Sequence, residues 1–122
     1  MAETVYSTVV TKLGESVNEF LEQGMLITFK DNAPAELAEF CILHSENNLR
    51  KDIQAGDVLT IGSEHSYQVT AVGEAVNKNL QSLGHITLRF DGATEPDLAG
   101  TLSLEAKDIS AINIGDEIKI ER

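Results

Sequence analysis

The sequence has little of what secreted, membrane-spanning and nucleic-acid-binding proteins need. Its 122 residues include a single cysteine, Cys41, so the chain can form no internal disulfide and no cysteine-based zinc cluster. Nine lysine and arginine residues stand against 20 aspartate and glutamate residues, which gives a formal net charge of −11. Such a surface repels the phosphate backbone of nucleic acids, and we expect no nucleic-acid partner. It suits basic protein partners, although acidity is also a common route to plain solubility.

Long apolar runs are also absent. No run approaches the roughly 20 residues that a helix needs to cross a bilayer. The first residues, Met1–Tyr6, lack the basic and apolar regions of a secretory signal. We therefore expect a cytoplasmic protein that does not insert into the membrane. Apolar residues still make up 42% of the chain and charged residues 24%, which is typical of one globular domain over residues 1–122.

What the chain does contain is an internal repeat. The segment Val10–Asn18 (VTKLGESVN) returns 59 residues later, at Val69–Asn77, as VTAVGEAVN. Two more blocks recur in the same order. Phe29 and Leu37–Ala38 correspond to Phe90 and Leu98–Ala99, and Gly56–Asp57 corresponds to Gly115–Asp116. We infer two similar halves, at about residues 5–61 and 66–121. Because half a chain of this length buries little apolar surface alone, the halves should share one core.

Each half predicts the same order of elements. A strand rich in Val and Thr precedes a short helix that ends at a glycine; an alternating strand, a proline-containing loop and two further strands follow. The expected strands are 5–13, 25–29, 40–44, 58–61, 67–72, 86–90, 101–104 and 117–120, and the expected helices are 15–23 and 74–83. Closure of such a sheet would leave no exposed edge. The sequence therefore predicts a mainly β fold: a single-domain, barrel-like sheet built from an internal duplication, with two short helices.

Common enzyme signatures are missing, which leaves the histidines as candidates. There is no glycine-rich phosphate loop, no HExxH and no GxSxG motif. The spacing of His44, His65 and His85 suggests no metal site, and a lone histidine is more often structural. At an offset of 61, His44 corresponds to Glu105, and His85 also lacks a histidine counterpart. A residue found in one half of a duplicated scaffold is not required by the fold, so both are candidates for function, whereas His65 is expected to be exposed.

Five stretches of the chain resemble a known family. The family is the glucitol/sorbitol-specific IIA component of the bacterial phosphoenolpyruvate-dependent sugar phosphotransferase system (PTS). The stretches are Met25–Phe29 (MLITF), Ala33–Leu37 (APAEL), Phe40–His44 (FCILH), Val69–Gly73 (VTAVG) and Leu83–Gly92 (LGHITLRFDG). The similarity runs from about Val5 to Ile120, and the last stretch is the most distinctive.

The resemblance implies a phosphocarrier that needs no cofactor and no metal. A member of this family accepts a phosphoryl group from the phosphocarrier protein HPr on one histidine. It passes the group to a cysteine of the IIB component during uptake of the sugar alcohol (glucitol or sorbitol). The family's acceptor follows a Cys-x-x-His stretch, which maps onto His44. Some members carry a second histidine two residues later, where this chain has Glu46, so we expect no essential role there.

The surroundings of His44 are less defined by the sequence. Phosphotransfer needs a neutral imidazole nitrogen and donors that neutralise the phosphoryl oxygens, and we expect backbone N–H groups beside His44. His85 is a candidate for stabilising the phosphoryl group, with a structural role as the open alternative. Cys41 is expected to be a buried small side chain. The alternative function is a non-catalytic acidic docking or regulatory module of the same fold, which would take up no phosphoryl group.

Overall fold

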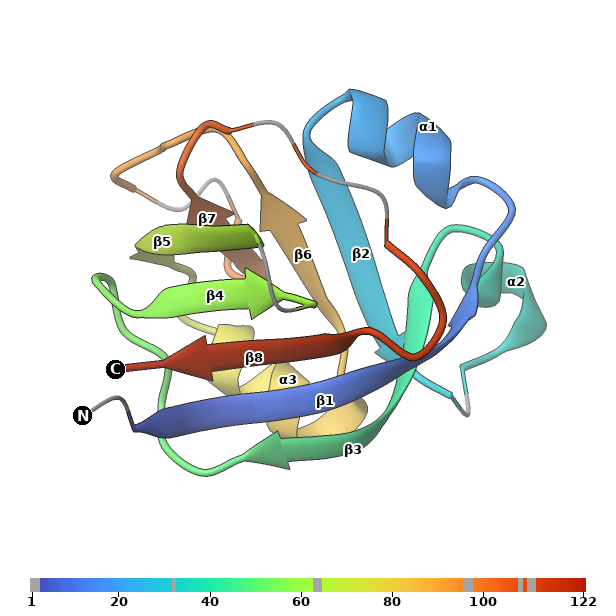
Figure 1. Cartoon of the computed structure of the whole chain (residues 1–122), viewed down its shortest axis with the longest axis horizontal. Helices are drawn as coiled ribbons and strands as arrows, with labels where there is room; N and C mark the ends of the chain where they lie inside the picture. The colour runs from blue at the N-terminus through green and yellow to red at the C-terminus, as the bar shows by residue number, and fades with distance from the viewer. Residues whose placement is uncertain (1–2, 32, 63–64, 96–97, 108, 110–111) are drawn as a thin grey trace.

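The barrel predicted from the sequence is closed and has eight strands. The computed structural model describes residues 3–31, 33–62, 65–95, 98–107, 109 and 112–122. Within them lie β1 (Thr4–Leu13), β2 (Met25–Lys30), β3 (Ile42–Leu49), β4 (Val58–Ile61), β5 (His65–Val72), β6 (Ile86–Arg89), β7 (Thr101–Leu104) and β8 (Glu117–Glu121). They close in the order β1-β3-β2-β6-β7-β5-β4-β8 (Figure 1). The mainly β, barrel-like, single-domain fold is confirmed.

The described residues hold three short helices where the sequence predicts two. The expected helices are present as α1 (Val17–Glu22) and α3 (Val76–Leu83), each starting two residues later than expected. The third, α2 (Ala35–Ala38), lies in the segment expected to be a loop. Its single turn begins after Pro34, whose carbonyl accepts hydrogen bonds from the N–H groups of Leu37 and Ala38. A turn of four residues is too short to show a helical period in the sequence.

The third strand is longer than the sequence predicts. The expected strand is 40–44, whereas β3 runs from Ile42 to Leu49. Its second part, SENN, is polar and has little intrinsic strand preference. It is extended because it pairs with β1, where Ser7 faces Asn48 and Tyr6 faces Leu49. Tertiary pairing decides its conformation here.

The strand order has a pseudo-twofold symmetry. Exchanging β1 with β5, β2 with β6, β3 with β7 and β4 with β8 reproduces the same closed order. Gly14 and Gly73 repeat the same close contact, since an added Cβ would lie 2.3 Å from the carbonyl oxygen of Ala38 and 2.2 Å from that of Ala99, respectively. The halves interleave, because β2 pairs with β6 and β4 pairs with both β5 and β8. The symmetry fits the inferred duplication of residues 5–61 and 66–121, which stays a prediction; Pro96, one of the two matched prolines, lies outside the described residues.

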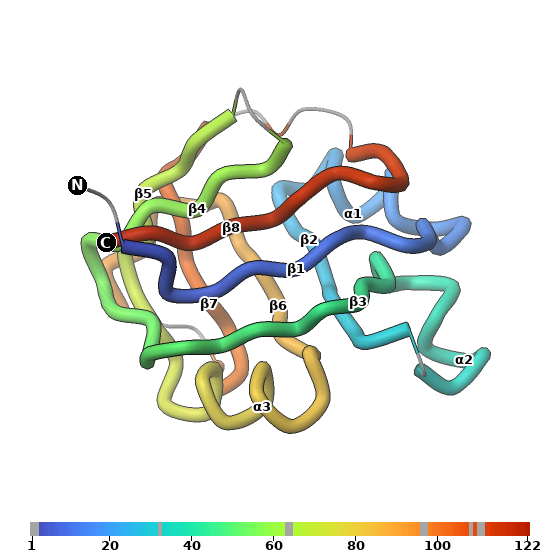
Figure 2. The backbone as a smooth tube through the Cα atoms, turned by 60° about the horizontal axis from the view of Figure 1, so that its bottom comes forward, coloured from blue at the N-terminus to red at the C-terminus, as the bar shows by residue number. Residues whose placement is uncertain are grey.

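Side chains fill the barrel. The larger of the two clusters of buried apolar residues in the described part of the chain includes Leu26, Ile42, Leu59, Leu88 and Ile120. The remaining cavity has a volume of about 10 Å³, close to the minimum for one water molecule. A sugar therefore does not fit inside. Helix α3 packs against the barrel beside β3, with Val76 and Leu80 buried (Figure 2).

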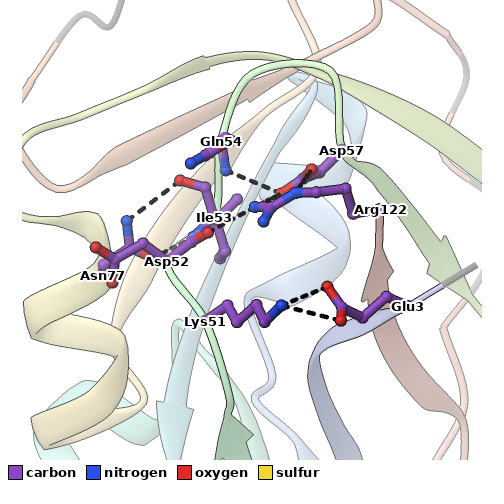
Figure 3. A network of polar contacts seen from close by, with 8 residues as sticks. All are labelled: Glu3, Lys51, Asp52, Ile53, Gln54, Asp57, Asn77 and Arg122. Atoms are coloured by element: carbon purple, nitrogen blue, oxygen red, sulfur yellow. Dashed lines mark hydrogen bonds and ion pairs between the residues drawn. The ribbon is translucent and has the colours of Figure 1, made fainter.

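Polar contacts join the two ends of the chain (Figure 3). The backbones of Glu3 and Arg122 exchange two hydrogen bonds of 2.9 and 2.8 Å. The guanidinium of Arg122 donates to both carboxylate oxygens of Asp57, at 3.0 and 3.2 Å, and to the carbonyl of Asp52 at 2.8 Å. Lys51 pairs with Glu3 at 2.8 Å in a more exposed position. These contacts hold β1 and β8 to the loop before β4. Among the described residues, no helix has both the length and the apolar character needed to span a membrane.

Candidate active site

His44 lies inside the barrel and has no exposed surface. It is the third residue of β3, paired with Val10 of β1 on one side and Lys30 of β2 on the other. In the second half, the strand register makes Leu104 the counterpart of His44, where the sequence analysis gives Glu105. In β3, Ile42 pairs with Leu13, and in β7, Leu102 pairs with the equivalent Val72. His44 and Leu104 each follow two residues later. The other half thus fills this position with a buried aliphatic side chain, so the fold itself does not require a histidine there.

Both ring nitrogens of His44 have partners. Nδ1 lies 2.7 Å from the Thr8 hydroxyl, and Nε2 lies 2.7 Å from the carbonyl oxygen of Gly84. Neither partner is a backbone N–H group, and the expectation of such donors for a phosphoryl group stays a prediction. Burial lowers the pKa of His44, and the hydrogen bond to Gly84 only partly opposes this. The ring is therefore neutral at neutral pH, which is the nucleophilic form.

Gly84 reaches the imidazole because it has no side chain. It ends α3 in the left-handed conformation, with φ +62°. An added Cβ would lie 2.5 Å from Cγ of Lys30 and 2.7 Å from Cε1 of His44. Its carbonyl also accepts a hydrogen bond of 2.9 Å from the Thr28 hydroxyl. The sequence identifies this glycine as a helix terminator, but its contact with His44 comes from the tertiary fold.

His85 directly follows Gly84 and is half-buried. Its Nδ1 donates to the Thr28 carbonyl at 3.0 Å, and its ring packs against Phe29 with centroids 4.8 Å apart. A carbonyl only accepts, so Nδ1 carries a proton and the neutral ring has its lone pair on Nε2. Within the described part of the chain, Nε2 has no hydrogen bond. His85 can therefore donate from Nε2 to a phosphoryl group only as an imidazolium. His65, by contrast, is exposed at the start of β5, as expected.

No sequence motif marks Thr8, Thr28 and Lys30 as parts of the site. The threonines are buried and hydrogen-bonded, Thr8 to His44 and Thr28 to Gly84. Lys30 pairs with His44 across β2 and β3; its positive charge lowers the pKa of that ring, whereas the negative charge of the neighbouring Asp31 raises it. The pairings of β1 with β3, β2 with β3 and β2 with β6 bring these residues to the site, and no local motif marks them. In the described ranges, no three His, Cys, Asp or Glu side chains converge as metal ligands.

Comparisons with known proteins identify the family of this chain. The family model of the PTS system glucitol/sorbitol-specific IIA component matches residues 5–119. The chain belongs to this family. Two relatives, the PTS system glucitol/sorbitol-specific EIIA components of Shigella flexneri and Escherichia coli (strain K12), are each 39% identical over 117 residues. The match covers 96% of this chain and 94% of each relative.

A solved structure extends the comparison to the fold. The crystal structure of a PTS system IIA component from Enterococcus faecalis V583 is similar, with a TM-score of 0.79 and 29% sequence identity. The similarity covers 92% of this chain and 96% of that one. Membership of the glucitol/sorbitol-specific IIA family supports a phosphocarrier role in the sugar phosphotransferase system.

Proposed function

We propose that this IIA chain accepts a phosphoryl group from HPr on Nε2 of His44 and passes it to a cysteine of the IIB component, in the cytoplasm, during uptake of glucitol or sorbitol. The observation that carries the proposal is a neutral histidine buried where the other half has Leu104. Its Nδ1 is anchored to Thr8, while Nε2 faces Gly84, next to Lys30.

The reaction needs positioning more than acid–base chemistry. The lone pair of Nε2 attacks the phosphorus, and the bond from phosphorus to the donor's histidine nitrogen breaks with its electron pair returning to that nitrogen. The second transfer reverses this, with a cysteine thiolate of IIB as the nucleophile. Such transfers are catalysed mainly by alignment and by neutralising charge on the phosphoryl oxygens. Lys30 is the cation nearest to this task.

Access to Nε2 requires the segment after α3 to move. The Gly84 carbonyl stands where the phosphoryl group must arrive. Three side-chain hydrogen bonds hold Gly84 and His85: Thr28 and His44 to Gly84, and His85 to Thr28. At about 1 kcal/mol net each, breaking them costs about 3 kcal/mol. An open state would then be populated at roughly 1%, which is enough to support turnover.

The test is phosphoryl uptake, measured by intact mass. The protein is incubated with phosphoenolpyruvate, the first enzyme of the system and HPr. We expect a gain of one acid-labile phosphate that maps to the peptide containing His44. His44→Gln should abolish the gain and stay folded by circular dichroism, whereas the matched variant His85→Gln should keep the acceptor and only slow the transfer.

Each other outcome has a distinct meaning. A gain that maps to His85 would retain the phosphocarrier and overturn the acceptor. No gain with an active donor would favour an acidic docking or regulatory module.

A further inference from the structure

The Thr8 hydroxyl lies between the His44 ring and a backbone carbonyl. Thr8 is on β1, with 2% of its surface exposed, and its side chain contacts His44 and Ser45 of β3. Its Oγ1 lies 2.7 Å from Nδ1 of His44 and donates a hydrogen bond to the carbonyl of Ser45. The other half has no such pair, because Leu104 replaces the histidine.

Without the Gly84 contact, these two contacts set one direction for the hydrogen bonds. A hydroxyl has one proton and a carbonyl can only accept, so Thr8 donates to Ser45 and its oxygen accepts from Nδ1–H of His44. A neutral imidazole that carries its proton on Nδ1 has its lone pair on Nε2. That nitrogen faces Gly84 and the Lys30 side chain, and Nδ1 faces the barrel interior.

The Gly84 carbonyl favours the opposite tautomer. At 2.7 Å from Nε2, it is attractive only if Nε2 carries the proton. With Gly84 in place, a neutral ring cannot satisfy both contacts at once: a proton on Nε2 would make Thr8 donate its hydrogen bond to Nδ1 instead of to Ser45. When Gly84 moves away, no carbonyl competes for a proton on Nε2. The hydrogen bonds from Nδ1–H to Thr8 and from Thr8 to the Ser45 carbonyl can then form together. The same movement therefore exposes Nε2 and releases its lone pair.

We propose that Thr8 is the positioning residue for phosphotransfer, and that its hydroxyl keeps the proton on Nδ1 so that the bond to phosphorus forms at Nε2. The inference rests on the proposed acceptor role of His44. In the step, Nε2 gains phosphorus and the donor nitrogen recovers the electron pair of the broken bond. The His44 ring keeps its Nδ1 proton throughout, and Thr8 accepts the hydrogen bond from the positively charged phosphoimidazole ring.

Three variants test the proposal. Thr8→Val keeps the size and removes the hydroxyl, Thr8→Ser keeps the hydroxyl, and Thr11→Val is the matched control at an exposed position on the same strand. We expect Thr8→Val to slow phosphorylation by phospho-HPr about 10–100-fold at saturating donor. We expect Thr8→Ser and Thr11→Val to stay within about threefold of the wild type. The KM for phospho-HPr should be unchanged in Thr8→Val, because only the transfer step is slowed. A purely structural role would not give this combination of a lower rate, an unchanged KM and rescue by serine.

A spectroscopic measurement on the wild type keeps the test decisive if Thr8→Val does not fold. In protein labelled with ¹⁵N at histidine, the phosphorylated form should show phosphorus coupled to Nε2 of His44 and a protonated, slowly exchanging Nδ1. Phosphorus on Nδ1, or an unchanged rate in a folded Thr8→Val variant, would overturn the role of Thr8 and leave the phosphocarrier proposal standing. Labelling of His85 alone would overturn both.

Discussion

The carbonyl oxygen of Gly84 lies 2.7 Å from Nε2 of His44. This contact brings the end of α3 directly onto the ring that we propose as the phosphoryl acceptor. It also makes the resting site a closed one, since His44 has no exposed surface. A buried acceptor is protected from water between transfers, and its reactivity then depends on how readily the segment after α3 opens.

Gly84→Ala should therefore damage both stability and activity. The methyl group would lie 2.5 Å from Cγ of Lys30 and 2.7 Å from Cε1 of His44, and the residue would keep an unfavourable φ of +62°. We expect the free energy of unfolding to fall by about 2–4 kcal/mol from the combined strain and overpacking. Urea unfolding measures this loss, and phosphoryl uptake should fall with it because the ring is displaced.

Gly62→Ala is the matched control for the backbone contribution. Gly62 has a similar φ of +68°, but an added Cβ would meet no atom within 4 Å. Its replacement should lower the free energy of unfolding by only about 1 kcal/mol and leave phosphotransfer unchanged. Equal losses in the two variants would contradict the close approach of Gly84 to His44.

The buried neutral ring predicts a loss of stability in acid. Burial lowers the pKa of His44 in the folded state below its unfolded value of about 6.5. Above that pH neither state binds the proton, and the stability is complete. As the pH falls, the unfolded chain takes up a proton that the folded chain does not. The free energy of unfolding then falls, by up to about 1.4 kcal/mol per pH unit, until the folded pKa is reached.

Urea unfolding at a series of pH values between 7 and 5 measures this dependence. His44→Leu, which places in the first half the residue type of Leu104, should flatten the curve. His65→Gln, at an exposed position, should leave it as it is. A curve of the same slope in wild type and His44→Leu would show that the titration of His44 does not contribute.

The fold was predictable because its signals are local and repeated. Alternation of apolar residues, the Gly-Asp turns and the matched halves predict most strands to within two residues, and β4 (Val58–Ile61) is predicted with the observed bounds. The prediction fails where tertiary pairing decides, as in the polar end of β3. It also fails for α2, whose single turn is too short for a period.

The candidate site was only partly predictable, for the same physical reason. His44 stands out as a histidine in one half of a repeat, and family resemblance adds its role. Thr8, Thr28 and Lys30 carry no such mark, because ordinary strand sequences contain threonine and lysine. Their contacts with the site arise from pairings between β1 and β3 and between β2 and β3. The burial of His44 could not be predicted from the sequence either, since it depends on how α3 covers the barrel.

The single cysteine should be unreactive in the folded protein. Cys41 is 2% exposed, which confirms the expected buried side chain, and burial raises the pKa of its thiol to about 11. Because only the thiolate reacts, modification by a disulfide reagent at pH 8 should be at least about 100-fold slower than in urea. Absorbance at the released thiolate's wavelength measures both rates. Equal rates would mean that the segment around Cys41 opens readily.

Arg122 should contribute more to stability than any exposed ion pair nearby. The Asp57 side chain is 3% exposed and takes its hydrogen bonds from the Arg122 guanidinium and from the Gln54 N–H. Arg122→Met would leave a buried carboxylate with one of these partners. We expect a measurable loss in the free energy of unfolding, moderated by water because the arginine side chain is 35% exposed.

The exposed pair of Lys51 and Glu3 gives the matched control, because it lies in the same network (Figure 3). Both of its side chains are 52% exposed, so water and salt screen their attraction. Lys51→Met should lower the free energy of unfolding by less than about 1 kcal/mol, and by less still in 0.5 M salt. If Arg122→Met cost no more than Lys51→Met in the same urea titration, Asp57 would have to be hydrated in solution. The closure of β8 against the loop before β4 would then depend on backbone pairing alone.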